Sequence, residues 1–184
     1  MGPLLHRRED SLLLVVDVQE RHYPHCWGGD AVLNAISKVI QVATILNVPV
    51  VVTEQYVKTF GNTVADIATH LHGCAPIEKR CFSAMLSPEA ATTIDRLRKQ
   101  QIVIVGAETH ICVLQTALQA LEGGMSVTVV EDAVTSRSRR DHELAIARLR
   151  QHGVCIATWE MVTYEWLLSS DAPEFKKILP LVKG

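Results

Sequence analysis

The sequence predicts an α/β protein of three layers, in which a six-stranded, Rossmann-like parallel sheet lies between two layers of helices. Three observations predict this fold. Six short apolar runs rich in β-branched residues recur along the 184 residues, segments with helical periodicity separate them, and the runs are continuously apolar. Continuous apolar runs are typical of strands covered on both faces, and alternating strands and helices are typical of a parallel sheet with right-handed crossovers.

The expected strands are 12–16, 48–53, 76–80, 101–105, 126–130 and 154–158. From the second strand onward they recur about every 26 residues, close to the length of one βαβ unit. The run at 76–80 is the weakest of the six. The regular spacing favours one sheet and a single domain over residues 1–184, since a chain of 20.3 kDa leaves little room for a second domain.

Helical periodicity fills the gaps between these strands. Apolar residues share one helical face in 32–46, in 111–121 and in 142–149. Ser87, Pro88 and Glu89 have the order of an N-cap, a first-turn proline and a first-turn acid. Two more helical patterns, 160–169 and 172–182, follow the last strand, and we expect them to cap the sheet or to form a subunit interface.

Composition excludes several classes of protein. A net charge of −2 with no basic stripe argues against a nucleic-acid partner, and no apolar run has the roughly 18–20 residues that a membrane span needs. The N-terminus lacks the pattern of a signal peptide, so we expect a cytoplasmic protein, with mitochondria left open. Five cysteines without a C-x-x-C motif argue against a disulfide framework or a structural zinc cluster.

Reactive side chains stand where the expected strands end, which is where ligands bind in sheets of this kind. Asp17 follows the first strand, Lys79 ends the weak third strand, and Cys112 follows the fourth. For each there is a plainer alternative: Asp17 as a loop cap, Lys79 as a solvated lysine, Cys112 as a packing residue. Thr109 is expected to cap a helix from His110, which would place Cys112 in a first turn, where the helix dipole lowers a thiol pKa.

Three motifs containing these residues resemble the isochorismatase-like hydrolases, the cysteine hydrolases that include nicotinamidases. They are Leu-Val-Val-Asp-Val-Gln at 14–19, Glu-Lys-Arg-Cys-Phe-Ser-Ala at 78–84, and Val-Gly-Ala-Glu-Thr-His-Ile-Cys-Val at 105–113. The resemblance extends from about residue 11 to the C-terminal helices. Stretches 53–56 and 158–161 are most similar to the branch named isochorismatase domain-containing proteins, whose substrates are largely unassigned.

The resemblance implies a catalytic triad of Asp17, Lys79 and Cys112. It also implies a cis peptide bond between Ala107 and Glu108, which would aim the N–H groups of Glu108 and Cys112 at the substrate oxygen as an oxyanion hole. On this basis we expect a cofactor-independent hydrolase that cleaves a small amide or related carbonyl compound through a thioester. The alternative from another class is a catalytically silent binding or scaffold protein that keeps the fold.

Substrate-binding residues are expected on the loops that face this cleft. The candidates are Gln19, Tyr23, Tyr56 and Phe82, with Trp27 and Phe60 as further aromatic wall residues. No metal is expected, because the place of the nicotinamidase metal ligands holds residues 54–57 without a histidine; Asp66, His70 and His72 are a chance alternative. The apolar tail favours a homo-oligomer, a dimer or tetramer, although packing within one chain would serve equally.

Overall fold

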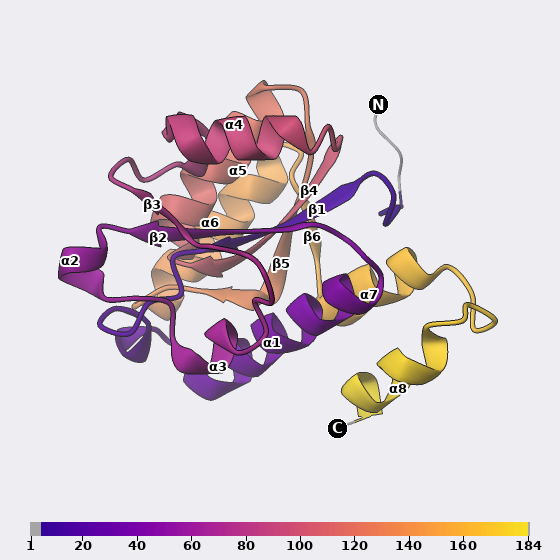
Figure 1. The fold of residues 1–184 in the computed structure, drawn as a ribbon. Coiled ribbons are helices and arrows are strands. Elements are labelled where there is room, and N and C mark those ends of the chain that lie inside the picture. Colours follow the sequence, from indigo (N-terminus) through magenta and orange to yellow (C-terminus); the bar gives the residue numbers. More distant parts are fainter. Residues whose placement is uncertain (1–4, 184) are drawn as a thin grey trace.

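A computed structural model describes residues 5–183 and confirms the predicted α/β fold (Figure 1). Its single sheet has six parallel strands in the order β3-β2-β1-β4-β5-β6. The strands are β1 Ser11–Val16, β2 Val50–Gln55, β3 Ile77–Lys79, β4 Gln101–Ala107, β5 Ser126–Thr135 and β6 Cys155–Ala157. The chain runs outward from β1 to one edge and then returns to β4, so the order reverses between β1 and β4.

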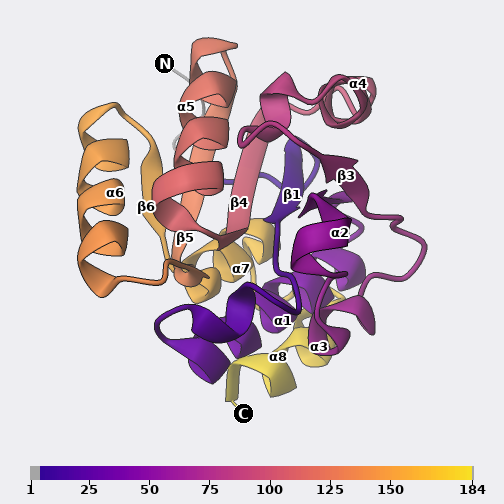
Figure 2. The same cartoon turned by 90° about the vertical axis from the view of Figure 1, so that its left-hand side faces the viewer.

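Helices cover both faces of the sheet, as the two views show (Figures 1 and 2). One face is covered by α1 Gly29–Ile45, α3 Ala65–Ala68, α7 Trp159–Leu167 and α8 Phe175–Lys183. The other is covered by α4 Pro88–Arg96, α5 Leu114–Glu122 and α6 Arg139–Gln151. Short turns complete the chain: η1 Tyr23–His25, α2 Val57–Phe60, η2 Ala84–Leu86 and η3 Thr109–Val113.

The central strand β1 explains why the apolar runs are continuous. Leu13 and Val15 pack into the core beneath α1, whereas Leu12, Leu14 and Val16 pack into the core beneath α4 and α5. Successive side chains of a strand point to opposite faces, so a strand buried on both faces needs an apolar residue at every position. All six residues of β1 are buried; Leu12–Val16 are apolar, and the polar Ser11 at the start donates its hydroxyl proton to the Arg7 carbonyl at 2.7 Å.

The C-terminal helices pack within the chain. Trp166 and Ile178 are buried in the same core as α1, and the Trp166 indole donates to Ser11 Oγ at 3.0 Å. Met161, Tyr164 and Leu168 remain exposed on α7. Much of the apolar surface of α7 and α8 is therefore buried within one chain. This is the packing that was weighed against an oligomer interface.

Several boundaries differ from the sequence prediction. β2 begins and ends two residues later than expected, so Glu54 and Gln55 lie in the strand and do not follow it. β5 continues to Thr135 and includes Glu131 and Asp132, which the sequence placed after it. The Ser87 cap of α4 is present, its hydroxyl accepting from Ala90 N–H at 3.5 Å.

The connection from β4 to α5 also differs. It begins with the π-helical turn η3, whose N-cap position is Glu108, without a side-chain cap. The expectation that Thr109 caps a helix here is wrong: Thr109 Oγ1 pairs with His142 Nδ1 at 3.0 Å. A π-helical turn widens the backbone and is frequent at functional sites.

Gly106 allows β1 and β4 to approach closely just before the site. Its φ is +117°, and a Cβ atom there would lie 2.1 Å from the carbonyl oxygen of Val16. Only glycine fits this position, because any side chain would overlap the neighbouring backbone. Within residues 5–183, no helix is both long enough and apolar enough to cross a membrane.

Candidate active site

The three reactive residues lie at the carboxyl ends of three strands on the same side of the sheet. Asp17 follows β1, Cys112 lies in the turn after β4, and Lys79 is the last residue of β3. β1 and β4 are the pair between which the strand order reverses, so Asp17 and Cys112 stand at the place where ligands bind in open α/β sheets.

Asp17 and Lys79 form a buried ion pair. Lys79 Nζ lies 2.7 Å from Asp17 Oδ2, and their side chains are 0% and 3% exposed. Thr53 Oγ1 donates to Asp17 Oδ1 at 2.8 Å. Asp17 has a φ of 51°, a left-handed conformation that turns its backbone sharply at the strand end. Both carboxylate oxygens are thus held by specific donors.

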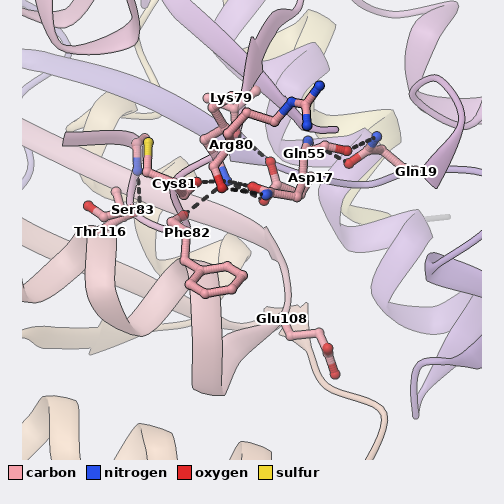
Figure 3. Close-up of polar contacts among 12 residues, drawn as sticks. Asp17, Gln19, Gln55, Lys79, Arg80, Cys81, Phe82, Ser83, Glu108 and Thr116 are labelled. Carbon is pink, nitrogen blue, oxygen red and sulfur yellow. Dashed lines mark hydrogen bonds and ion pairs between the residues drawn. The ribbon is translucent and has the colours of Figure 1, made fainter. Parts of the chain in front are cut away.

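Lys79 is held on its other sides by hydrogen-bond acceptors (Figure 3). Its ammonium donates to Gln55 Oε1 at 2.8 Å, to the Phe82 carbonyl at 2.9 Å and to the Cys81 carbonyl at 3.3 Å. These acceptors fix the position of the ammonium, and the ammonium in turn orients the Asp17 carboxylate.

Cys112 is a buried thiol in the same site. Burial raises the pKa of Cys112, the negative charge of Asp17 raises it further, and Lys79 opposes both effects. The expectation of a lowered thiol pKa is therefore wrong for the resting site, because burial outweighs the favourable charge. At neutral pH the sulfur keeps its proton until a base removes it.

Glu108 is fixed by residues that follow β5. The peptide bond between Ala107 and Glu108 is cis. Glu108 Oε2 accepts from Arg137 N–H at 2.8 Å and from Arg137 Nε at 3.1 Å. Over residues 5–183, the backbone N–H of Glu108 donates to no backbone or side-chain acceptor. It is therefore available to a ligand.

A small cavity of about 90 Å³ connects these groups. Asp17, Cys112 and Glu108 line it, together with Phe82 and Ile111. The complete lining also includes Gln19, His22, Gln55, Phe60 and Ala107. Asp17 and Cys112 both line this cavity, and most of its surface is apolar.

The four residues expected to bind substrate divide into two pairs. Gln19 and Phe82 line the cavity, whereas Tyr23 and Tyr56 do not. Tyr23 is buried and its hydroxyl donates to the Gly29 carbonyl at 2.8 Å. The guanidinium of Arg80 stacks on the Tyr56 ring at 3.4 Å.

The side chain of Gln19 is already used within the protein. Its Nε2 donates to the carbonyls of Gln55 and Gly61 at 2.9 and 2.7 Å, and its Oε1 accepts from Gln55 N–H at 2.7 Å. Gln19 therefore anchors the loop after β2 to the loop after β1, and its amide is not free to bind a substrate.

Thr53 and Gln55 were not among the predicted site residues: the expected strand 48–53 contained Thr53 without a role and ended before Gln55. In a strand that extends to residue 55, Thr53 and Gln55 point to the same face. They contact Asp17 and Lys79 respectively. If the strand had been extended to residue 55, the alternation of its side chains would have indicated both residues. Nothing in the sequence pattern indicated Arg137.

Metal-ligating side chains gather at one place among residues 5–183. His22, Cys26 and Glu108 have ligand atoms within 4.8 Å of one another. Burial raises the pKa of Cys26 to about 12 and lowers that of His22. Asp66, His70 and His72 form no such group in the described part of the chain.

A much larger hollow of about 1010 Å³ lies at the amino ends of the strands, opposite the Cys112 cavity. It is lined by the first residues of β4, β5 and β6, namely Gln101, Ser126 and Cys155. None of the three residues at the strand carboxyl ends lines it. Size alone would favour this hollow, but the reactive groups and the reversal of strand order both favour the small cavity.

Comparison with known proteins adds three relatives. A family model for the isochorismatase domain matches residues 11–161. Isochorismatase domain-containing protein 2 of Bos taurus is 37% identical over 174 residues, 94% of this chain and 83% of that protein. The secreted isochorismatase effector Isc1 of Phytophthora sojae is 36% identical over 178 residues, 94% of this chain and 84% of that protein. The structure of MAR1 ribonuclease from Caenorhabditis elegans is similar with a TM-score of 0.92 and 34% identity, covering 98% of this chain and 93% of that one.

Proposed function

The chain belongs to the isochorismatase family of hydrolases, and from this premise we propose that it is a cofactor-independent cysteine hydrolase that cleaves a small amide or related carbonyl compound. The observation that carries the proposal is that Asp17 and Cys112 share one small cavity, with Lys79 buried against Asp17. A nucleophile, a base and a group that orients the base are the components of covalent acyl transfer.

In this mechanism Asp17 accepts the thiol proton as Cys112 Sγ attacks the carbonyl carbon. The carbonyl π electrons move to the oxygen, and the N–H groups of Glu108 and Cys112 stabilise the resulting oxyanion. The tetrahedral intermediate collapses, the C–N bond breaks, and Asp17 gives its proton to the leaving amine. Asp17 then deprotonates a water that attacks the thioester, which releases the acid and restores the thiol.

The size of the cavity bears on the acyl group. The cavity has a volume of about 90 Å³, smaller than the engineered cavity of about 150 Å³ that holds benzene, so a small acyl group fits it better than an aromatic one. Phe60, Phe82 and Ile111 make its apolar wall. We therefore expect short aliphatic amides to be better substrates than aromatic ones.

Two other functions compete with this proposal. The relative from Caenorhabditis elegans is named a ribonuclease. Here the cavity is small and has the Asp17 carboxylate on its wall, in a chain of net charge −2, and these features disfavour a polyanion. The other rival is a catalytically silent scaffold, and a scaffold does not require a base and a nucleophile to be held together.

The test is ammonia release from acetamide, propionamide and benzamide by the wild type and by Cys112→Ala, with Cys155→Ala as a control at an exposed cysteine. We expect Cys112→Ala to abolish release and Cys155→Ala to leave it unchanged. Asp17→Asn should reduce the rate by about 10²–10⁴-fold. The double variant Asp17→Asn/Cys112→Ala should be little worse than Cys112→Ala alone, because the residues act as a unit.

Amide hydrolysis at the wild-type rate in Cys112→Ala would refute this mechanism. The same proteins are incubated with single-stranded RNA, because RNA cleavage that survives Cys112→Ala would favour a ribonuclease. Treatment with iodoacetamide followed by mass spectrometry addresses the scaffold: a wild-type Cys112 that stays unalkylated while the exposed Cys155 reacts would mean that its thiol is not available as a nucleophile.

Single-domain organisation, a homo-oligomer and a cytoplasmic location remain predictions. Light scattering that gives a mass of one chain, 20.3 kDa, at micromolar concentration would reject the oligomer. The relative from Phytophthora sojae is named a secreted effector, so the location of this chain needs its own measurement, by fractionation of the cells that make it.

A further inference from the structure

We propose that His22, Cys26 and Glu108 form a three-ligand site for a zinc-like divalent cation at the wall of the Cys112 cavity. His22 and Cys26 flank the short turn η1, and Glu108 follows β4, so the fold brings together residues that are far apart in the sequence. Their ligand atoms all lie within 4.8 Å of one another, with His22 Nε2 3.7 Å from Glu108 Oε1.

These separations fit a tetrahedral site after small side-chain movements. With zinc–ligand bonds of 2.0–2.3 Å, two ligands of a tetrahedral ion are about 3.3–3.8 Å apart. The His22–Glu108 separation of 3.7 Å is already in that range. It is also too long for a hydrogen bond, so these two atoms are close without being joined to each other.

The set of donors selects the class of cation. An imidazole nitrogen, a thiolate and a carboxylate together suit zinc and its close neighbours, whereas calcium and magnesium prefer oxygen ligands alone. The thiolate and the carboxylate would balance the charge of a divalent ion. Three protein ligands leave the fourth position of a tetrahedral ion to water, and His22 and Glu108 both line the cavity.

Neighbouring residues hold two of the three ligands in place through hydrogen bonds, as is usual at metal sites. Glu108 Oε2 is occupied by the two donors of Arg137, which leaves Oε1 on the side of His22. Trp27, next to Cys26, donates its N–H to the Ser136 carbonyl at 2.8 Å. The segment with the thiol and the segment with Arg137 are therefore fixed to each other.

The experiment is a titration of the metal-free full chain with Co²⁺ under anaerobic conditions, followed by absorption spectroscopy, and then competition by Zn²⁺. We expect a stoichiometric complex with a thiolate-to-cobalt charge-transfer band in the near ultraviolet and strong visible bands typical of four-coordinate cobalt. Cys26→Ser should remove the charge-transfer band. Cys74→Ser, which changes another cysteine that is largely shielded from solvent, should keep it.

His22→Gln supplies a second variant in case Cys26→Ser fails to fold. It should keep the charge-transfer band but weaken Co²⁺ binding by at least about tenfold, the loss expected even for a supporting residue of a metal site. The proposal is overturned if the wild type binds no stoichiometric Co²⁺, if a folded Cys26→Ser keeps the band, or if His22→Gln binds as tightly as the wild type. None of these readouts depends on hydrolysis, so the proposed function is tested separately.

Discussion

Replacement of Lys79 by methionine tests how much the buried ion pair contributes to folding. Methionine has an unbranched side chain of similar length, so the variant removes the charge with little change in packing. Asp17 then remains buried with Thr53 as its side-chain donor, and the acceptors around the former ammonium lose their donor. The perturbation is therefore mainly electrostatic.

The expected cost is large because the charge left behind is shielded from water. Breaking a buried ion pair by removing one partner costs about 3–5 kcal/mol. Domains of this size unfold with about 5–15 kcal/mol, so Lys79→Met should lose at least about a fifth of the stability. In Lys79→Met/Asp17→Asn the carboxylate is also removed, and about 1–3 kcal/mol should be regained through the coupling of the two residues.

The assay is urea unfolding at pH 7, followed by circular dichroism and by tryptophan fluorescence so that the two transitions can be compared. Lys58→Met, at an exposed lysine, is the matched control and should change the free energy of unfolding by less than about 0.5 kcal/mol. The reasoning fails if Lys79→Met loses less than about 1 kcal/mol, or if the double variant is less stable than Lys79→Met.

Three further predictions concern the framework around the site. Gly106→Ala places a Cβ 2.1 Å from a backbone oxygen of β1 and should cost more than about 4 kcal/mol; soluble protein with the wild-type melting temperature would contradict this. Gln19→Leu leaves three buried backbone partners unpaired at about 1–3 kcal/mol each, and an unchanged melting temperature would show that water replaces the amide. The pKa of Cys26 is raised to about 12, so the folded state keeps a proton that the unfolded state loses above pH 9. In the metal-free protein, stability from this group is therefore full below about pH 9 and falls toward pH 12, by up to about 1.4 kcal/mol per pH unit. Urea unfolding of metal-free Cys26→Ala should show a shallower decline than the metal-free wild type.

The fold was predictable because the apolar runs follow directly from the burial of a parallel sheet. The run Leu12–Val16 of β1 is continuously apolar, as a strand buried on both faces requires, and only Ser11 at its start is polar. Strand ends were less predictable. Glu54 and Gln55 continue β2 although they are polar, because they pair with β3 through their backbone, which the side-chain pattern does not report.

The site was predictable where a residue follows a strand and not where it depends on contacts between distant loops. Asp17, Lys79 and Cys112 stand at strand ends, so topology alone brings them to one edge. The pairing of Arg137 with Glu108 joins two loops whose lengths and turns leave no periodic pattern. The thiol pKa was misjudged for a related reason, since burial depends on the whole surrounding core.

The raised pKa of Cys112 is consistent with the proposed chemistry because of the charges already present. Asp17 and Lys79 neutralise each other, so a resting thiolate would add an unbalanced negative charge at a buried position. A neutral thiol avoids that cost. The proton then has to leave as the carbon–sulfur bond forms, at the moment when the negative charge passes to the substrate oxygen and the backbone donors. A base near the sulfur is required for this order of events, and Asp17 lines the same cavity as Cys112.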